Sequence, residues 1–186
     1  MPIITLGGKP ISINGEIPEN ETKATDFQLI ATNLSNKSLS DFHGSTLLLN
    51  IFPSVDTETC ATSVRSFNKS ASTIKNTKVL CISRDLPFAQ NRFCGAEGLD
   101  NVIMLSDFAN GDFGKNYGIE IQDGPLANLH SRAIIIINLD GKISYSEQVS
   151  EIANEPNYEK ALAENKIIVL NFYAKWCPTC KAEQPR

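Results

Sequence analysis

The residues of this chain best suited to chemistry are its five cysteines, Cys60, Cys81, Cys94, Cys177 and Cys180. The first residues, MPIITLGG, show no basic stretch followed by an apolar core, so we expect a cytoplasmic protein. In a reducing compartment a cysteine is more often catalytic, metal-binding or buried than part of a structural disulfide. Each cysteine therefore has to be interpreted from its own surroundings.

Cys60 follows an apolar run, residues 46–52, and the segment PSVDTET, which predicts a position in the first turn of a helix. The free N–H groups and partial positive charge of a helix N-terminus favour the thiolate, which is the nucleophilic form. Thr57 can place a hydroxyl beside the sulfur or cap the helix. Pro53 fixes the preceding turn. The spacing alone fits a buried structural cysteine equally well.

The other cysteines of the first 163 residues differ in their surroundings. Cys81 lies in KVLCIS, an alternating apolar run that predicts a core strand. Cys94 lies on a predicted helix, either as a reactive thiol or as a core residue. His43 and His130 have no second histidine or carboxylate at ligand spacing, so we expect no metal site. Arg65, Arg84 and Arg92 could add positive potential near Cys60, although such arginines are more often solvated.

Short apolar runs alternate with amphipathic stretches along the chain. This order predicts an α/β sandwich with a mixed central sheet, preceded by a hairpin around Gly7-Gly8. The predicted strands are residues 46–52, 78–83, 102–106 and 133–138, with a hairpin turn at Asp140-Gly141, and the predicted helices are residues 60–70, 87–98, 112–117 and 157–164.

The composition argues against several classes of partner. Net charge is −4, so no broad basic surface is expected to bind nucleic acid or an anionic membrane. No run approaches the roughly 18 apolar residues that span a bilayer.

Longer motifs show a family resemblance. PSVDTETC matches the Pro-x-x-x-Thr-x-x-Cys signature of peroxiredoxins. The segments LNIFPSVDTETCATSVRSFN, VLCISRDLPFAQNRFCGAEGL, YGIEIQDGPL and SRAIIIIN resemble those of bacterial thiol peroxidases, which are atypical two-cysteine peroxiredoxins. The resemblance extends from the N-terminal hairpin to about Ala163, so residues 1–163 are expected to form one domain of thioredoxin-like fold.

The resemblance implies a role for each matching residue. Cys60 would attack the peroxide, with Thr57 as its hydroxyl partner, Pro53 as the shielding proline and Arg132 as the guanidinium that stabilises the thiolate. Cys94 would resolve the resulting sulfenic acid in an intrachain Cys60–Cys94 disulfide, which thioredoxin would reduce. The substrates would be hydrogen peroxide and organic hydroperoxides. The family also implies a homodimer and no metal or organic cofactor.

The Cys60–Cys94 pairing raises a geometric question. A disulfide needs Cα atoms within about 7 Å, and two separate helix starts seldom bring cysteines so close. We therefore expect one or both helices to unwind locally between the reduced and oxidised forms. A different hypothesis is a redox sensor or relay, in which Cys60 passes its oxidation to a partner without turnover.

The last residues, 164–186, differ in character from the rest. They contain an apolar run followed by WCPTC, and they resemble the first strand and active-site helix start of a TlpA-like thioredoxin domain. Cys177 would be the attacking thiol and Cys180 the resolving one. A segment this short rarely folds unaided, so we expect a truncated or vestigial fragment rather than an autonomous domain. Disulfide reduction through this pair stays an alternative function.

Overall fold

The computed structural model describes residues 2–71, 74 and 76–164. The chain divides into two compact units, residues 1–156 and 157–186, and each is described by itself. In the second unit, residues 158–164 are helical, as the sequence predicts. Cys177 and Cys180 lie outside the described residues.

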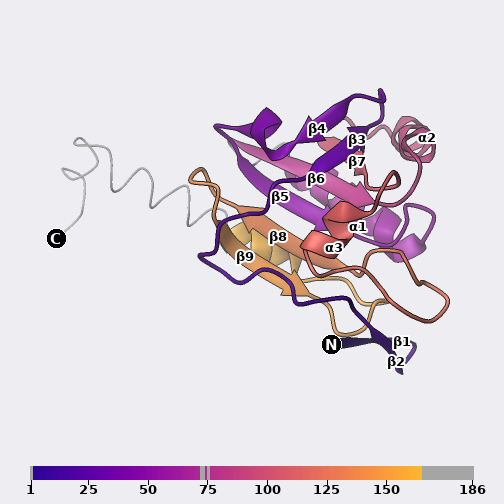
Figure 1. Cartoon of the computed structure of the whole chain (residues 1–186). Helices are drawn as coiled ribbons and strands as arrows, with labels where there is room; N and C mark the ends of the chain where they lie inside the picture. Colours follow the sequence, from indigo (N-terminus) through magenta and orange to yellow (C-terminus); the bar gives the residue numbers. More distant parts are fainter. Residues whose placement is uncertain (1, 72–73, 75, 165–186) are drawn as a thin grey trace. The chain divides into compact units, whose positions relative to one another are not determined.

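In the described part of the first unit, seven strands form one sheet in the order β4-β3-β7-β6-β5-β8-β9 (Figure 1). The interior strand β5 runs parallel to β6 and antiparallel to β8, so the predicted mixed sheet is confirmed. Every residue of β5 is buried, which explains its unbroken apolar run. The bounds are β3 (Gln28–Ala31), β4 (Asn36–Ser38), β5 (Thr46–Ile51), β6 (Thr77–Ser83), β7 (Val102–Ser106), β8 (Ala133–Ile137) and β9 (Ile143–Gln148).

Helices cover both faces of this sheet. Alternate residues of a strand point to opposite faces. Leu49 of β5 belongs to the core cluster that contains Phe113, whereas neighbouring Asn50 accepts a hydrogen bond from Ser63 at 2.9 Å. Because Ser63 lies on α1 and Phe113 on α3, these helices lie on opposite faces. The bounds are α1 (Glu58–Ala71), α2 (Pro87–Glu97) and α3 (Asp112–Asn116).

The predicted N-terminal hairpin is also present, as β1 (Ile3–Leu6) and β2 (Lys9–Ser12) (Figure 1). One carboxylate anchors it: Glu151 accepts the N–H groups of Gly7 and Gly8, both at 3.0 Å, and the hydroxyl of Thr5 at 2.8 Å. These hydrogen bonds, led by that of Gly8, lower the pKa of Glu151 to about 2. The hairpin is thereby tied to the segment that follows β9.

The hairpin of β3 and β4 was not predicted from the sequence. Its second strand is only Asn-Lys-Ser, which lacks an apolar alternation, and its turn contains no glycine. Leu34 takes the left-handed conformation there, with φ of 67°, where glycine or asparagine is usual. A short helix of 3-10 type, η1 (Leu39–Phe42), then leads into β5. No helix among the described residues combines the length and apolar character needed to cross a membrane.

Candidate active site

Cys60 is the third residue of α1, close to the predicted position in the first turn. Its N–H donates to the hydroxyl of Thr57 at 3.4 Å. The carbonyl of Thr57 accepts the N–H of Ala61 at 3.0 Å, so Thr57 lies where the helix begins. The Cys60 side chain is fully buried, with 0% of its surface exposed.

Pro53 is buried between the end of β5 and the start of α1. Its fixed φ and its missing N–H suit the place where the chain leaves the sheet ladder. The loop from Pro53 to Thr57 is therefore the part of the backbone that sets where Cys60 lies.

Arg132 lies at the same end of the sheet as this loop. It directly precedes β8, whose first residue, Ala133, pairs with Ile51 at the end of β5. Because β5 and β8 are antiparallel, the end of one strand lies beside the start of the other. The topology thus brings Arg132 and the start of α1 to the same end of the sheet.

The segment after β9 connects Arg132 with α1. Nε of Arg132 donates to the carbonyl of Ile152 at 3.0 Å, and the next carbonyl, that of Ala153, accepts the hydroxyl of Thr59 at 3.4 Å. Nη1 of Arg132 is buried and has no hydrogen-bond partner among the described residues. A buried cationic donor without an acceptor is unfavourable unless an anion joins it.

The other two described cysteines are free thiols, like Cys60. Cys81 is fully buried on β6, and burial raises its pKa to about 12, as befits a core residue. Cys94 is half-buried in the last turn of α2, not at a helix start as expected from the sequence, and its carbonyl accepts the N–H groups of Gly98 and Leu99. Burial, with a smaller contribution from Asp100, raises the pKa of the Cys94 thiol.

A buried polar cluster lies beneath α3, and it corrects two sequence interpretations. His130, fully buried, has a carboxylate partner after all: its Nε2 lies 2.9 Å from Oδ2 of Asp107. Arg84 is not a solvated charge, since it forms ion pairs with Glu120 and, at 3.7 Å, with Asp107. Asp107 also accepts the N–H of Gly114 at 3.0 Å. The partners are distant in sequence, so no local pattern signals them.

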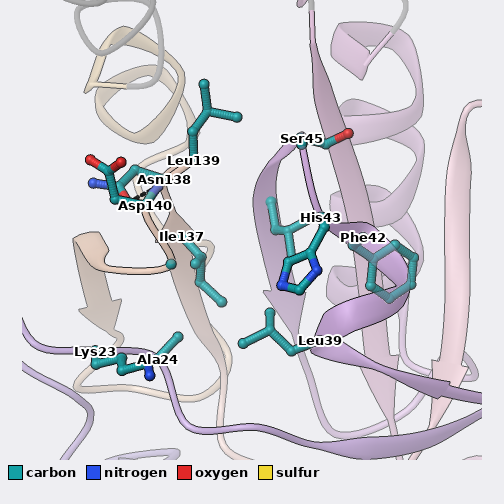
Figure 2. A pocket seen from close by; sticks show the side chains of 13 residues that line it. Lys23, Ala24, Leu39, Phe42, His43, Ser45, Ile137, Asn138, Leu139 and Asp140 are labelled. Carbon is teal, nitrogen blue, oxygen red and sulfur yellow. Dashed lines mark hydrogen bonds between the residues drawn. The ribbon is translucent and has the colours of Figure 1, made fainter.

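A cavity of about 180 Å³ lies at the other end of β5 (Figure 2). Side chains of Leu39, Phe42 and His43 face those of the turn between β8 and β9 across it. Lys23 and Asp140 add the two charges of its lining. Within residues 2–71, 74 and 76–164, no group of three or more histidine, cysteine, aspartate or glutamate side chains is arranged to hold a metal ion.

Comparisons with known proteins show which families the chain matches. Residues 19–162 match the Redoxin family, and residues 149–186 match the Thioredoxin family. The thiol peroxidases of Mycobacterium bovis and Mycobacterium tuberculosis are each 53% identical over 160 residues, which is 86% of this chain and 96% of theirs.

Solved structures show the same fold. A peroxiredoxin-like protein from Aquifex aeolicus has a TM-score of 0.85 and 32% identity, covering 89% of this chain and 96% of its own. The thiol peroxidase from Chromobacterium violaceum has a TM-score of 0.80 at 24% identity, covering 88% of this chain and 97% of its own.

Proposed function

Because the chain belongs to the thiol peroxidases of the peroxiredoxin (redoxin) family, we propose that Cys60 is the thiol that reduces hydrogen peroxide and organic hydroperoxides. The observation that carries the proposal is the buried Nη1 of Arg132, at the end of the sheet where α1 begins, because this nitrogen has no acceptor in the part of the chain that the structure describes. A thiolate and an incoming peroxide are the anionic and polar groups that this nitrogen needs.

The reaction follows from these groups. The Cys60 thiolate attacks the terminal oxygen of the peroxide, so an S–O bond forms as the O–O bond breaks. Arg132 and the hydroxyl of Thr57 stabilise charge on the two oxygens in the transition state. The departing oxygen takes a proton and leaves as water or an alcohol, and Cys60 becomes a sulfenic acid. Pro53 shields the sulfur from water on one side.

The burial of Cys60 makes motion part of this mechanism. A sulfur with 0% exposure is not accessible to a peroxide until a neighbouring side chain moves. A separate motion serves the next step, because Cys94 lies on another helix, α2, and its own burial raises the pKa of its thiol. Opening the last turn of α2 exposes Cys94 and favours its thiolate.

Resolution then proceeds within one chain. The Cys94 thiolate attacks the sulfenic sulfur of Cys60, a disulfide forms and water leaves. Two thiols of thioredoxin reduce the disulfide and return Cys60 to the thiolate. We still expect local unwinding of one or both helices at this step, because a disulfide needs Cα atoms within about 7 Å.

Thioredoxin-coupled NADPH oxidation driven by peroxide tests this assignment. Cys60→Ser is expected to abolish turnover, and Cys94→Ser to stop it after one oxidation per chain. Cys81→Ala is the matched control, because it removes an equally buried sulfur outside the proposed cycle. Turnover that persists in Cys60→Ser would contradict the proposal. One oxidation per chain without turnover in the unmodified protein would favour the redox sensor.

We also propose a homodimer in the cytoplasm. Leu86, Phe88 and Phe108 are exposed by 51%, 65% and 44%, and they lie on neighbouring segments, after β6 and β7. Burial of such side chains against a second copy would lower the free energy of association. Light scattering of the purified chain is expected to give twice the monomer mass, with Phe88→Glu shifting it towards the monomer. A monomeric unmodified chain would contradict the proposal.

The match of residues 149–186 to the Thioredoxin family favours a second candidate function for Cys177 and Cys180. Cys177 would attack the Cys60–Cys94 disulfide, and Cys180 would release the mixed disulfide, leaving the oxidised pair in the C-terminal segment. One equivalent of peroxide followed by disulfide mapping tests this relay. The bond is expected at Cys177–Cys180 in the unmodified chain, whereas a bond that stays at Cys60–Cys94 would contradict the relay.

A further inference from the structure

The loop that precedes α1 is fastened to the framework by one carboxylate outside it, that of Asp85. Oδ1 of Asp85 accepts the hydroxyl of Ser54 at 2.7 Å. Oδ2 accepts the N–H of Val55 at 2.8 Å and the hydroxyl of Ser83 at 2.7 Å. All three donors are neutral, so this carboxylate organises backbone and hydroxyl groups instead of neutralising a cation.

From Ser54 the hydrogen bonds continue to Cys60. The carbonyl of Ser54 accepts the N–H and the hydroxyl of Thr57, both at 3.3 Å, and its own Oγ accepts the N–H of Asp56 at 3.2 Å. The Thr57 hydroxyl in turn accepts the N–H of Cys60 at 3.4 Å. An unbroken series of contacts therefore runs from the Asp85 carboxylate to the backbone of the reactive cysteine.

The same residue lies where α2 begins. Leu86 is the N-cap of α2 and Pro87 its first residue. Ser83, which donates to Asp85, also accepts a hydrogen bond from Nε2 of Gln90 in the first turn of α2, at 3.0 Å. The backbone carbonyl of Asp85 accepts the hydroxyl of Ser106 at the end of β7. Asp85 thus joins the start of α2 and the ends of two strands to the loop of Cys60.

From these contacts we propose that Asp85 is a positioning residue for the peroxidase reaction: it holds the loop from Pro53 to Thr57, and through it Cys60, in the arrangement that reacts with peroxide. The inference rests on the proposed function of Cys60. Release of the Asp85 carboxylate frees the loop and the start of α2 together. Asp85 therefore favours the peroxide-reactive arrangement over the open one in which Cys60 and Cys94 join.

Two rate constants separate positioning from general stability. One is the second-order rate constant for Cys60 oxidation by hydrogen peroxide, and the other is the first-order rate constant for Cys60–Cys94 disulfide formation. Both are obtained from acid-quenched intact mass spectra. In Asp85→Ala we expect peroxide oxidation to slow about tenfold to a hundredfold, as loss of orientation does. Disulfide formation is expected to stay unchanged or to accelerate.

Two milder variants keep the test decisive if Asp85→Ala does not fold. In Asp85→Asn the amide oxygen can accept from both Val55 and Ser83, while the amide nitrogen donates to Ser54 Oγ. Since the geometry survives and only the charge is lost, oxidation is expected within about threefold of the unmodified rate. Ser54→Ala removes the hydrogen bond to Oδ1 of Asp85, together with the one that Ser54 Oγ accepts from the N–H of Asp56, and is expected to slow oxidation about three- to tenfold.

Asp41→Ala is the matched control, because Asp41 accepts the N–H and hydroxyl of Ser38 at 2.7 and 2.9 Å, but at the other end of β5. It is expected to leave both rates unchanged. Equal slowing of both steps in Asp85→Ala, or an oxidation rate unchanged in Asp85→Ala and Ser54→Ala, would overturn the inference. Peroxide reduction that survives Cys60→Ser would instead overturn the proposed function, so the two failures are distinguishable.

Discussion

The two ends of β5 differ in opposite ways: one has reactive side chains that are buried, and the other has an open cavity but no reactive thiol among the described residues. Where β5 ends, Cys60 is fully buried, and Nη1 of Arg132 has no acceptor among the described residues. Where β5 begins, a cavity of about 180 Å³ is open, but its lining mixes apolar side chains with Lys23, His43 and Asp140 (Figure 2). None of the three cysteines that the structure describes lines that cavity.

This difference shows what to look for when the substrate is small. A peroxide needs little volume, so a preformed cavity is a poor guide to its site, although it is the usual guide for larger ligands. The better indicators are a nucleophile at a helix start and a buried donor that lacks an acceptor. The closed end of the sheet is therefore the reactive one, and reaction requires a local opening.

Loss of the Arg132 guanidinium should give the largest contrast between the two ends. Arg132→Met keeps a long apolar side chain but removes every donor, and we expect the rate of Cys60 oxidation to fall about 10²- to 10³-fold. Lys23→Met removes a cation at the cavity end. It is expected to change this rate less than twofold, because surface substitutions far from a site have small effects. Stopped-flow measurement of peroxide consumption checks both. Equal effects would remove the distinction between the ends.

Acid should destabilise the fold by protonating the Glu151 carboxylate. The N–H groups of Gly8 and Gly7 and the Thr5 hydroxyl lower the folded-state pKa of Glu151 to about 2, against about 4.3 in an unfolded chain. A lowered pKa stabilises the fold fully above about pH 4.3, and this contribution disappears as the pH falls towards 2. Thermal unfolding should show the chain more stable than Glu151→Gln at pH 6, with the difference shrinking across that window. A difference independent of pH would contradict this.

The ion pair between α1 and α2 should have a smaller effect. Nε and Nη2 of Arg65 donate to the two carboxylate oxygens of Glu97 at 2.7 and 2.9 Å, which raises the pKa of Arg65 and lowers that of Glu97. Because both groups contact solvent, Arg65→Ala is expected to accelerate Cys60–Cys94 disulfide formation only about two- to fivefold.

The control for the ion pair is Lys115→Ala. Lys115 is similarly exposed and lies 3.8 Å from Asp112, but both belong to α3, so separation of α1 from α2 does not break the pair. Disulfide formation at the unmodified rate in Arg65→Ala, or an equal acceleration in Lys115→Ala, would contradict this. The ion pair between Arg65 and Glu97 would then not restrain the separation of α1 from α2.

The elements that form the reactive end were predictable from the sequence. The unbroken apolar run of β5 predicts a strand buried on both faces, and Cys60 follows it at a helix start. Arg132 precedes another such run, so its place beside the end of β5 needs only the antiparallel pairing. By contrast β3 and β4 were missed, because a polar three-residue strand and a turn at Leu34 carry no local signal.

The contacts between these elements were not predictable. Asp107 and His130 are 23 positions apart, and Asp85 reaches Ser54 across 31 positions. Such pairs depend on strand order and register, which hydrophobic periodicity does not encode. Helix and strand patterns thus predict where Cys60 and Arg132 lie, whereas the hydrogen bonds that hold the Cys60 loop require the folded structure.

The smallest effect should come from the cavity. His43 and Phe42 contribute to its lining, and both precede β5, at the end opposite Cys60. If the cavity takes no part in peroxide reduction, His43→Ala should leave Cys60 oxidation and disulfide formation within about twofold of the unmodified rates, as surface substitutions away from a site do. A larger change in either rate constant would show that the two ends of β5 are coupled. The cavity would then contribute to the reaction.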